Sequence, residues 1–206
     1  MPTFYITVND QAVATVSTEE CDILTIRIDA SFDREELATL DVSGGKYPVD
    51  VESTYWTWVP ERPLLAGQRV AVEMREHGAS SHAGKTIAEL YPDDPPCTIT
   101  DFTLTDAMCD EIARRPRFRD KLAFQFASSS GTRLAGKTGA DEDSLALSVL
   151  WNWTDPATAS VSLHSYSLAD IRARNGGGER AREQMKIGGR LAFVLGDEPF
   201  ALSASL

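Results

Sequence analysis

Two short patterns of alternating apolar residues constrain the fold of this chain more than any other feature. In residues 24–29 and again in residues 70–75, every second side chain is apolar and its neighbours are mostly polar. Successive side chains of a strand point to opposite faces, so this period predicts strands with one buried face and one wet face. The patterns favour a mainly β protein, in the sense of a β-rich α+β fold.

Both patterns return 121 residues later, in residues 145–150 and 191–196. Two glycines keep the same spacing, and two further apolar pairs recur at spacings of 119 and 118 residues. The glycines are Gly67 and Gly188, and the pairs are Leu40 and Val42 with Ala159 and Val161, and Ile6 and Val8 with Phe124 and Phe126. Because order and alternation are both preserved, we expect two related antiparallel β units, sandwich- or barrel-like, with one merged sandwich as the alternative.

A proline-rich segment separates the two units. Residues 91–96 contain three prolines, and each proline lacks a backbone donor and disfavours helix in the residue before it. Thr105 begins an amphipathic pattern and Pro116 ends it, which predicts a helix over residues 105–115. The units are therefore expected to join through a Pro-rich turn and a short helix.

These breaks define the expected organisation of the chain. We expect an acidic β unit over residues 1–97, a connector over residues 98–120, and a second β unit over residues 121–206. Within the second unit, residues 167–186 contain three consecutive glycines between two arginine-bearing segments. This composition is typical of a mobile insertion.

The charge of the chain is negative and unevenly spread. The net charge is -11, and residues 1–97 hold 17 acidic and 7 basic side chains against 14 and 13 in residues 98–206. A field of this sign repels nucleic-acid phosphates and anionic membrane surfaces and attracts a basic protein. We therefore expect a basic protein partner and neither a nucleic acid nor a membrane.

The cysteines and histidines predict neither a disulfide framework nor a structural metal site. Cys21, Cys97 and Cys109 are an odd number without a C-x-x-C pair, which favours a reducing compartment and idle thiols. His77 and His82 lack the spacing of a zinc site, so neither a metal nor another cofactor is expected. The first ten residues lack the regions of a signal peptide, and no run of 18 apolar residues occurs. A cytoplasmic protein is the expectation.

One string invites a nucleotide-binding interpretation. Residues 131–138, GTRLAGKT, resemble the Walker A motif of the P-loop NTPases. The resemblance implies phosphate binding through Gly131, Gly136, Lys137 and Thr138. In that family a helix follows the loop, whereas here an alternating strand begins at Leu145. The internal repeat instead places the string in a hairpin.

No catalytic set stands out in the sequence. A nucleophilic hydrolase needs a serine or cysteine with a histidine base and an orienting acid. The chain has no G-x-S-x-G elbow and three histidines in total. We name no catalytic residue and expect a protein that is not an enzyme.

Two tryptophan pairs are the remaining candidates for a binding surface. Trp56 and Trp58, and likewise Trp151 and Trp153, are two residues apart, so each pair shares a face if it lies in a strand. An open face would offer indoles to a ligand or a protein partner. A closed face would make them core residues.

Three functions follow from these features. The leading hypothesis is a non-catalytic interaction factor, of the inhibitor or immunity type, whose acidic half neutralises a basic partner. The alternative is a β protein that binds a small molecule or a carbohydrate in a Trp-lined groove. The third is nucleotide binding through residues 131–138. The sequence predicts no oligomeric state.

Overall fold

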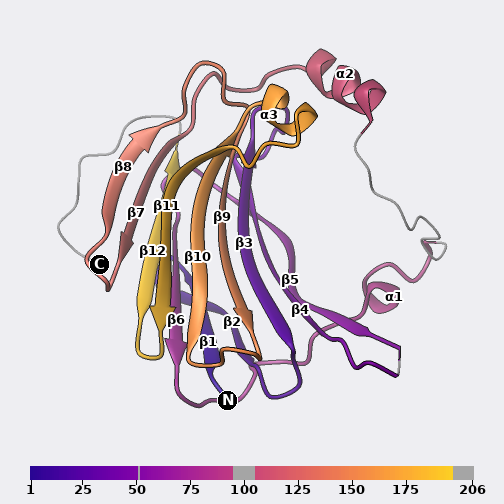
Figure 1. Ribbon diagram of the computed structural model, residues 1–206, viewed down its shortest axis with the longest axis vertical. Coiled ribbons are helices and arrows are strands. Elements are labelled where there is room, and N and C mark those ends of the chain that lie inside the picture. The colour runs from indigo at the N-terminus through magenta and orange to yellow at the C-terminus, as the bar shows by residue number, and fades with distance from the viewer. Residues whose placement is uncertain (51, 95–104, 197–206) are drawn as a thin grey trace.

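The computed structural model describes residues 1–50, 52–94 and 105–196 of the chain. It confirms a mainly β fold, in which twelve strands form two six-stranded antiparallel sheets (Figure 1). The first half contributes β1 (Thr3–Val8), β2 (Gln11–Ser17), β3 (Ile23–Ser31), β4 (Ala38–Lys46), β5 (Thr54–Leu64) and β6 (Arg69–Arg75). The second half contributes β7 (Ala123–Ser128), β8 (Arg133–Lys137), β9 (Ser144–Asn152), β10 (Thr158–Tyr166), β11 (Gly178–Lys186) and β12 (Arg190–Gly196).

The strand order shows that the two halves share both sheets. Sheet A has the order β2-β1-β6-β12-β7-β8, and sheet B has the order β11-β10-β9-β3-β4-β5. Each half supplies three neighbouring strands to each sheet. If each strand is replaced by its equivalent in the other half (β1 by β7, β2 by β8, and so on), both sheets keep the same strand order, read from the opposite edge. The sheets meet face to face as one merged sandwich, and among the described strands neither sheet closes into a barrel.

The register at the two junctions has the same spacing as the sequence repeat. In sheet A, Ala71 of β6 faces Ala192 of β12, and in sheet B, Arg27 of β3 faces Ser148 of β9. The members of both pairs are 121 residues apart. The two halves of the sandwich are therefore related by a local two-fold axis that passes through the centre of each sheet.

The core lies between the sheets and is built by the alternating patterns. Their inward residues are all buried, and they pack in one cluster that spans both halves. The members from the repeated patterns are Leu24, Ile26, Ile28, Val70, Val72, Met74, Leu145, Leu147, Val149, Leu191, Phe193 and Leu195. Gly67 and Gly188 precede β6 and β12 with φ of +79° and +84°, a backbone region that favours glycine.

Within the described residues, three short helices lie outside the sheets. The predicted helix is confirmed as α2 (Asp106–Arg114), and the Thr105 hydroxyl caps it by accepting a hydrogen bond from the Met108 amide at 3.3 Å. Helix α1 (Ile87–Leu90) was not foreseen from the sequence, although Thr86 and Glu89 form a capping box there. Residues 95–104, with Cys97 and part of the Pro-rich turn, lie outside the described residues. No helix in the described part of the chain has the length and apolarity to cross a membrane.

The segment expected to be a mobile insertion contains regular structure. Residues 167–186 form α3 (Leu168–Arg172) and strand β11, which pairs with β10 at the edge of sheet B. The Glu183 carboxylate of β11 accepts hydrogen bonds from the hydroxyls of Ser128 (3.0 Å) and Ser130 (2.7 Å). These bonds tie the edge of sheet B to the β7–β8 turn of sheet A.

Candidate functional site

A groove of about 560 Å³ opens at the edge of the sandwich, where β2 of sheet A and β5 of sheet B come together. We call it the Trp groove, because the indoles of Trp56 and Trp58 form one wall. All its lining residues belong to the acidic first half of the chain. They are Ser17, Glu19, Glu20, Cys21, Trp56, Trp58, Gly78, Ala79, Ser80, His82, Ala83 and Gly84.

The second wall is a strap formed by residues 77–86, which follows β6 and crosses from one sheet to the other. On sheet A, the Ser81 amide donates to the Thr15 carbonyl at 2.9 Å, and the Thr15 amide donates to the Ser81 hydroxyl at 3.0 Å. On sheet B, Lys85 and Thr57 exchange two backbone hydrogen bonds of 2.8 and 2.9 Å. The strap therefore covers part of the free edges of β2 and β5 and closes one side of the groove.

His82 braces the strap through both of its ring nitrogens. Its Nε2 lies 2.9 Å from the Trp58 carbonyl oxygen and its Nδ1 lies 2.9 Å from the Ser81 hydroxyl. A carbonyl can only accept, so Nε2 carries the proton. The other histidine of the strap, His77, lies 3.6 Å from the Glu76 carboxylate. Among the described residues, no three His, Cys, Asp or Glu side chains gather into a metal site.

A glycine allows the strap to approach the indoles. A β-carbon placed on Gly84 would lie 2.7 Å from the Trp56 β-carbon and 3.0 Å from the Trp58 ring. Both indoles are half-buried, and the register of the β4–β5 ladder shifts beside Trp58. The strap and this register shift in β5 together hold the two indoles against the groove. Any larger residue at position 84 would displace them.

The groove carries negative charge at its rim. Glu19 and Glu20 are exposed there, and neither forms an ion pair with a described residue. Cys21 lies below them and is buried. Desolvation, followed by the nearby carboxylates of Glu20 and Asp22, raises the pKa of its thiol to about 11. The groove thus offers aromatic faces and carboxylates, without a reactive thiol.

The thiol of Cys21 should be unreactive in the folded protein. A raised pKa leaves almost no thiolate at pH 7.5, and burial blocks access, so we expect a disulfide reagent to modify it at least about 100-fold more slowly than in urea. The measurement uses a Cys97→Ser, Cys109→Ser variant, in which Cys21 is the remaining thiol. A native rate close to that of free cysteine would contradict the electrostatic description of the groove.

The second tryptophan pair does not form a common surface. Trp151 is fully buried in β9, and its indole Nε1 donates to the Pro156 carbonyl at 3.2 Å. Trp153 lies beyond the end of β9 and is 59% exposed. The expectation of one shared face fails for this pair because the strand ends at Asn152, between the two tryptophans.

The Walker A-like string lies in the predicted hairpin. Gly131 is in the β7–β8 turn with φ of +100°, and Gly136 and Lys137 belong to β8, an antiparallel edge strand. Thr138 is buried, and its hydroxyl accepts from the Leu122 amide at 3.0 Å. A turn and then β9 follow the string, so this segment lacks the helix N-terminus that holds phosphate in a P-loop.

Several arginines of the second half form ion pairs with carboxylates. Arg117 pairs with Asp143, and Arg115 lies 3.1 Å from Asp33 of the first half. The other pairs in this region are Arg172 with Asp110, Arg180 with Glu142, and Arg182 with Glu179. The Arg115–Asp33 pair links the end of α2 to the turn after β3, and the Arg172–Asp110 pair joins α3 to α2.

Sequence reasoning identified the two groove tryptophans but missed the rest of this site. The carboxylates, the indoles and the strap come from three separate segments, residues 19–20, 56–58 and 77–86, and only the packing of β2 against β5 assembles them. No protein-family model, no curated protein and no solved structure matches this chain.

Proposed function

We propose that this chain is a non-catalytic interaction protein whose acidic first half binds a basic protein partner and takes one cationic side chain into the Trp groove. A single observation carries the proposal: the indoles of Trp56 and Trp58 share a groove with the unpaired carboxylates of Glu19 and Glu20. A cation is attracted both by the face of an indole and by a carboxylate. Arginine is best suited, because its guanidinium stacks on rings and binds carboxylates in pairs.

The charge of the whole first half supports the same partner. Its 17 acidic and 7 basic side chains surround the groove with a negative field. Such a field accelerates association with a cationic surface and repels anionic competitors. This is the electrostatic design of an inhibitor or immunity-type protein that neutralises a basic partner.

The chemistry of the groove supports a binding role without catalysis. Both ring nitrogens of His82 are engaged in hydrogen bonds, and the pKa of Cys21 is raised away from neutral pH. A general base needs a free nitrogen near its substrate, and a cysteine nucleophile needs a lowered pKa. Neither group of the groove meets its requirement.

A pair of small ligands tests the groove directly. N-acetylarginine amide should change the tryptophan fluorescence with millimolar affinity, whereas N-acetylcitrulline amide, its neutral counterpart, should not. Trp56→Ala should weaken binding of the arginine ligand roughly 2- to 30-fold, since a cation–π contact is worth about 0.5–2 kcal/mol. Trp153→Ala, an exposed tryptophan outside the groove, serves as the matched control and should leave affinity unchanged.

The partner is tested by affinity isolation from extract of the source cells at low and high salt. We expect a basic protein that binds at low salt and is released at high salt, and that binds a Glu19→Gln, Glu20→Gln variant more weakly. Equal binding of the citrulline and arginine ligands would refute the cationic groove. A protein retained equally by the wild type and the double variant would refute the role of the rim carboxylates.

Carbohydrate binding in the same groove is the second candidate. It is favoured by the half-buried indoles, which can stack on sugar rings, and by the serine hydroxyls beside them. A glycan that binds the wild type, fails to bind Trp56→Ala and is indifferent to the Glu19→Gln, Glu20→Gln change would establish this function instead.

A further inference from the structure

A second surface of the molecule exposes large apolar side chains in one place. Four such residues on the outer face of sheet B, together with Trp153 just beyond the end of β9, are between 37% and 59% exposed. We call them the outer patch: Ile23, Tyr47, Tyr55, Leu150 and Trp153. Exposed apolar residues scattered singly are ordinary, whereas a contiguous group is typical of an interaction surface.

The sheet register shows that the outer patch is contiguous. Tyr55 of β5 faces Gly45 of β4, and Gly45 faces Ile23 of β3, so these residues form one row across three strands spaced about 4.8 Å apart. In the next row, Leu150 of β9 faces Thr25, the second residue after Ile23 on the same face. The Trp153 amide donates to the Asp22 carbonyl at 2.8 Å, which places Trp153 beside Ile23.

Tyr47 fills the gap in that row. A β-carbon on Gly45 would lie 2.9 Å from the Tyr47 ring, so the glycine makes room for the ring to lie across β4. The Tyr47 amide also donates to the Asp22 carboxylate at 2.6 Å, which anchors the β4–β5 hairpin to the start of β3. This bond fixes the backbone that carries the Tyr47 ring.

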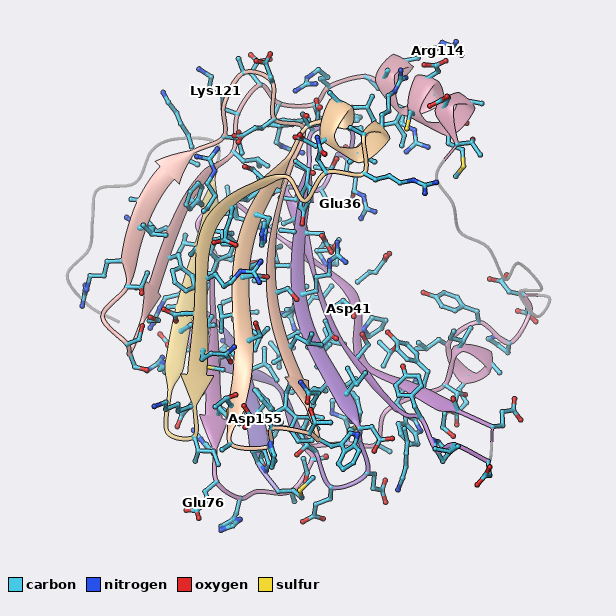
Figure 2. The ribbon with its side chains drawn as sticks, in the orientation of Figure 1. Glu36, Asp41, Glu76, Arg114, Lys121 and Asp155 are labelled. Atoms are coloured by element: carbon cyan, nitrogen blue, oxygen red, sulfur yellow. The ribbon has the colours of Figure 1, made fainter. Side chains whose placement is uncertain are left out.

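The surroundings of the outer patch resemble the rim of a protein interface. The adjoining row consists of hydroxyl side chains: Thr25 is partly exposed, whereas Ser43 and Thr57 are buried. Asp41 on β4 faces Arg27 of β3, and Asp155 lies at the lower end of the molecule in Figure 2. An apolar centre rich in tyrosine and tryptophan, surrounded by polar groups, is the arrangement of binding hot spots.

The outer patch lies at the same end of the sandwich as the Trp groove. Figure 2 shows Glu76, where the strap begins, and Asp155, next to the patch, at one end, and Arg114 and Lys121 at the other. Tyr55 and Trp56 are successive residues of the edge strand β5, so the patch and the groove lie on its two sides. Helix α1 contacts β5, and Ile87 at its start and Tyr91 just after its end are exposed.

We propose that the outer patch is the docking surface for the same basic protein partner, whose contact surface would carry an apolar centre flanked by arginine or lysine. This inference rests on the proposed function. One side chain in the groove buries far less than the roughly 800 Å² per partner of a stable interface, so a second contact area is required. The negative charge of the first half selects a basic partner for it.

Selection from a random twelve-residue peptide library displayed on phage tests the inference without knowledge of the partner. Peptides enriched on the wild-type protein should combine Arg or Lys with Leu, Phe or Trp. A Tyr55→Ala, Leu150→Ala variant should lower their affinity at least tenfold. Leu65→Ala, which removes an exposed leucine at the opposite end of β5, is the matched control and should change nothing. Thermal melts verify that each variant folds.

The outcome separates this inference from the groove. Peptides that lose affinity for the Tyr55→Ala, Leu150→Ala variant but keep it for Trp56→Ala support the outer patch and count against the groove. Peptides that depend on Trp56 alone overturn the outer patch and leave the groove intact. The inference is also overturned if no basic peptide is enriched, if a glycan requires Tyr55 and Leu150, or if sedimentation shows a homodimer that the double variant abolishes.

Discussion

Trp151→Ala is expected to lower the free energy of unfolding by about 3–5 kcal/mol, the usual cost of deleting a fully buried aromatic side chain. Trp151 has no exposed surface, faces Leu24 of β3 across the junction of the two halves, and faces Ala159 of β10 on its other side. Its loss would leave a cavity at the point where sheet B is continuous between the halves. Urea denaturation followed by circular dichroism gives the value.

Trp153→Ala provides the comparison, because it removes the same side chain only two residues away. Since Trp153 is mostly exposed, its loss should change the free energy of unfolding by less than about 0.5 kcal/mol. Equal effects of the two substitutions would show that Trp151 does not occupy the core position described above.

Arg119→Met should be the most destabilising change of a charged residue, by about 2–3 kcal/mol. The Arg119 guanidinium donates to four backbone carbonyls of the turn between β3 and β4, at distances of 2.7 to 3.3 Å. These carbonyls belong to Ser31, Arg34, Glu35 and Glu36. Hydrogen bonds from a charged donor contribute about 1.5–3 kcal/mol, and the four carbonyls would lose this shared donor.

Two further variants separate the effect of losing the positive charge of Arg119 from the effect of losing its hydrogen bonds. Arg119→Lys keeps the charge but loses the planar fork, so it should recover only part of the stability. Arg114→Met removes a charge from the exposed end of α2, where Figure 2 shows it away from the sheets, and should cost less than about 0.5 kcal/mol. A loss of less than 0.5 kcal/mol for Arg119→Met would contradict its role in the turn.

The strands of the core could be predicted because each half-buried strand leaves a period of two in the sequence. The segments around Leu24, Val70, Leu145 and Leu191 are all strands with the predicted face buried. The helix at residues 105–115 was equally accessible, since its cap and its stop are local signals. The hairpin over residues 131–138 followed from the repeat.

Strand β11 was missed for a physical reason. As an edge strand of nine residues, it carries Ala181, Glu183 and Met185 toward the other sheet, and the carboxylate among them hides the apolar period. Glu183 is accommodated because two serine hydroxyls from sheet A donate to it. Such a contact depends on residues more than 50 positions away and leaves no local pattern.

The candidate site was only half predictable for the same reason. Trp56 and Trp58 were conspicuous, but their neighbours Glu19 and Gly84 became relevant only through the packing of distant segments. The common face of Trp151 and Trp153 was wrong because the end of a strand interrupts the rule that residues two apart point the same way. Local patterns therefore located strands, and tertiary packing decided which side chains meet.

The continuity of both sheets across the two-fold relation has a consequence for biosynthesis and turnover. Neither half completes its sheets alone, because β3 and β6 would each lose a full-length neighbouring strand if the other half were missing. A nascent chain released after residue 97 would expose the unpaired edges of β3 and β6 and would be prone to aggregation. Conversely, a protease cut between residues 94 and 105 should yield two fragments that co-purify, held together by their shared strands.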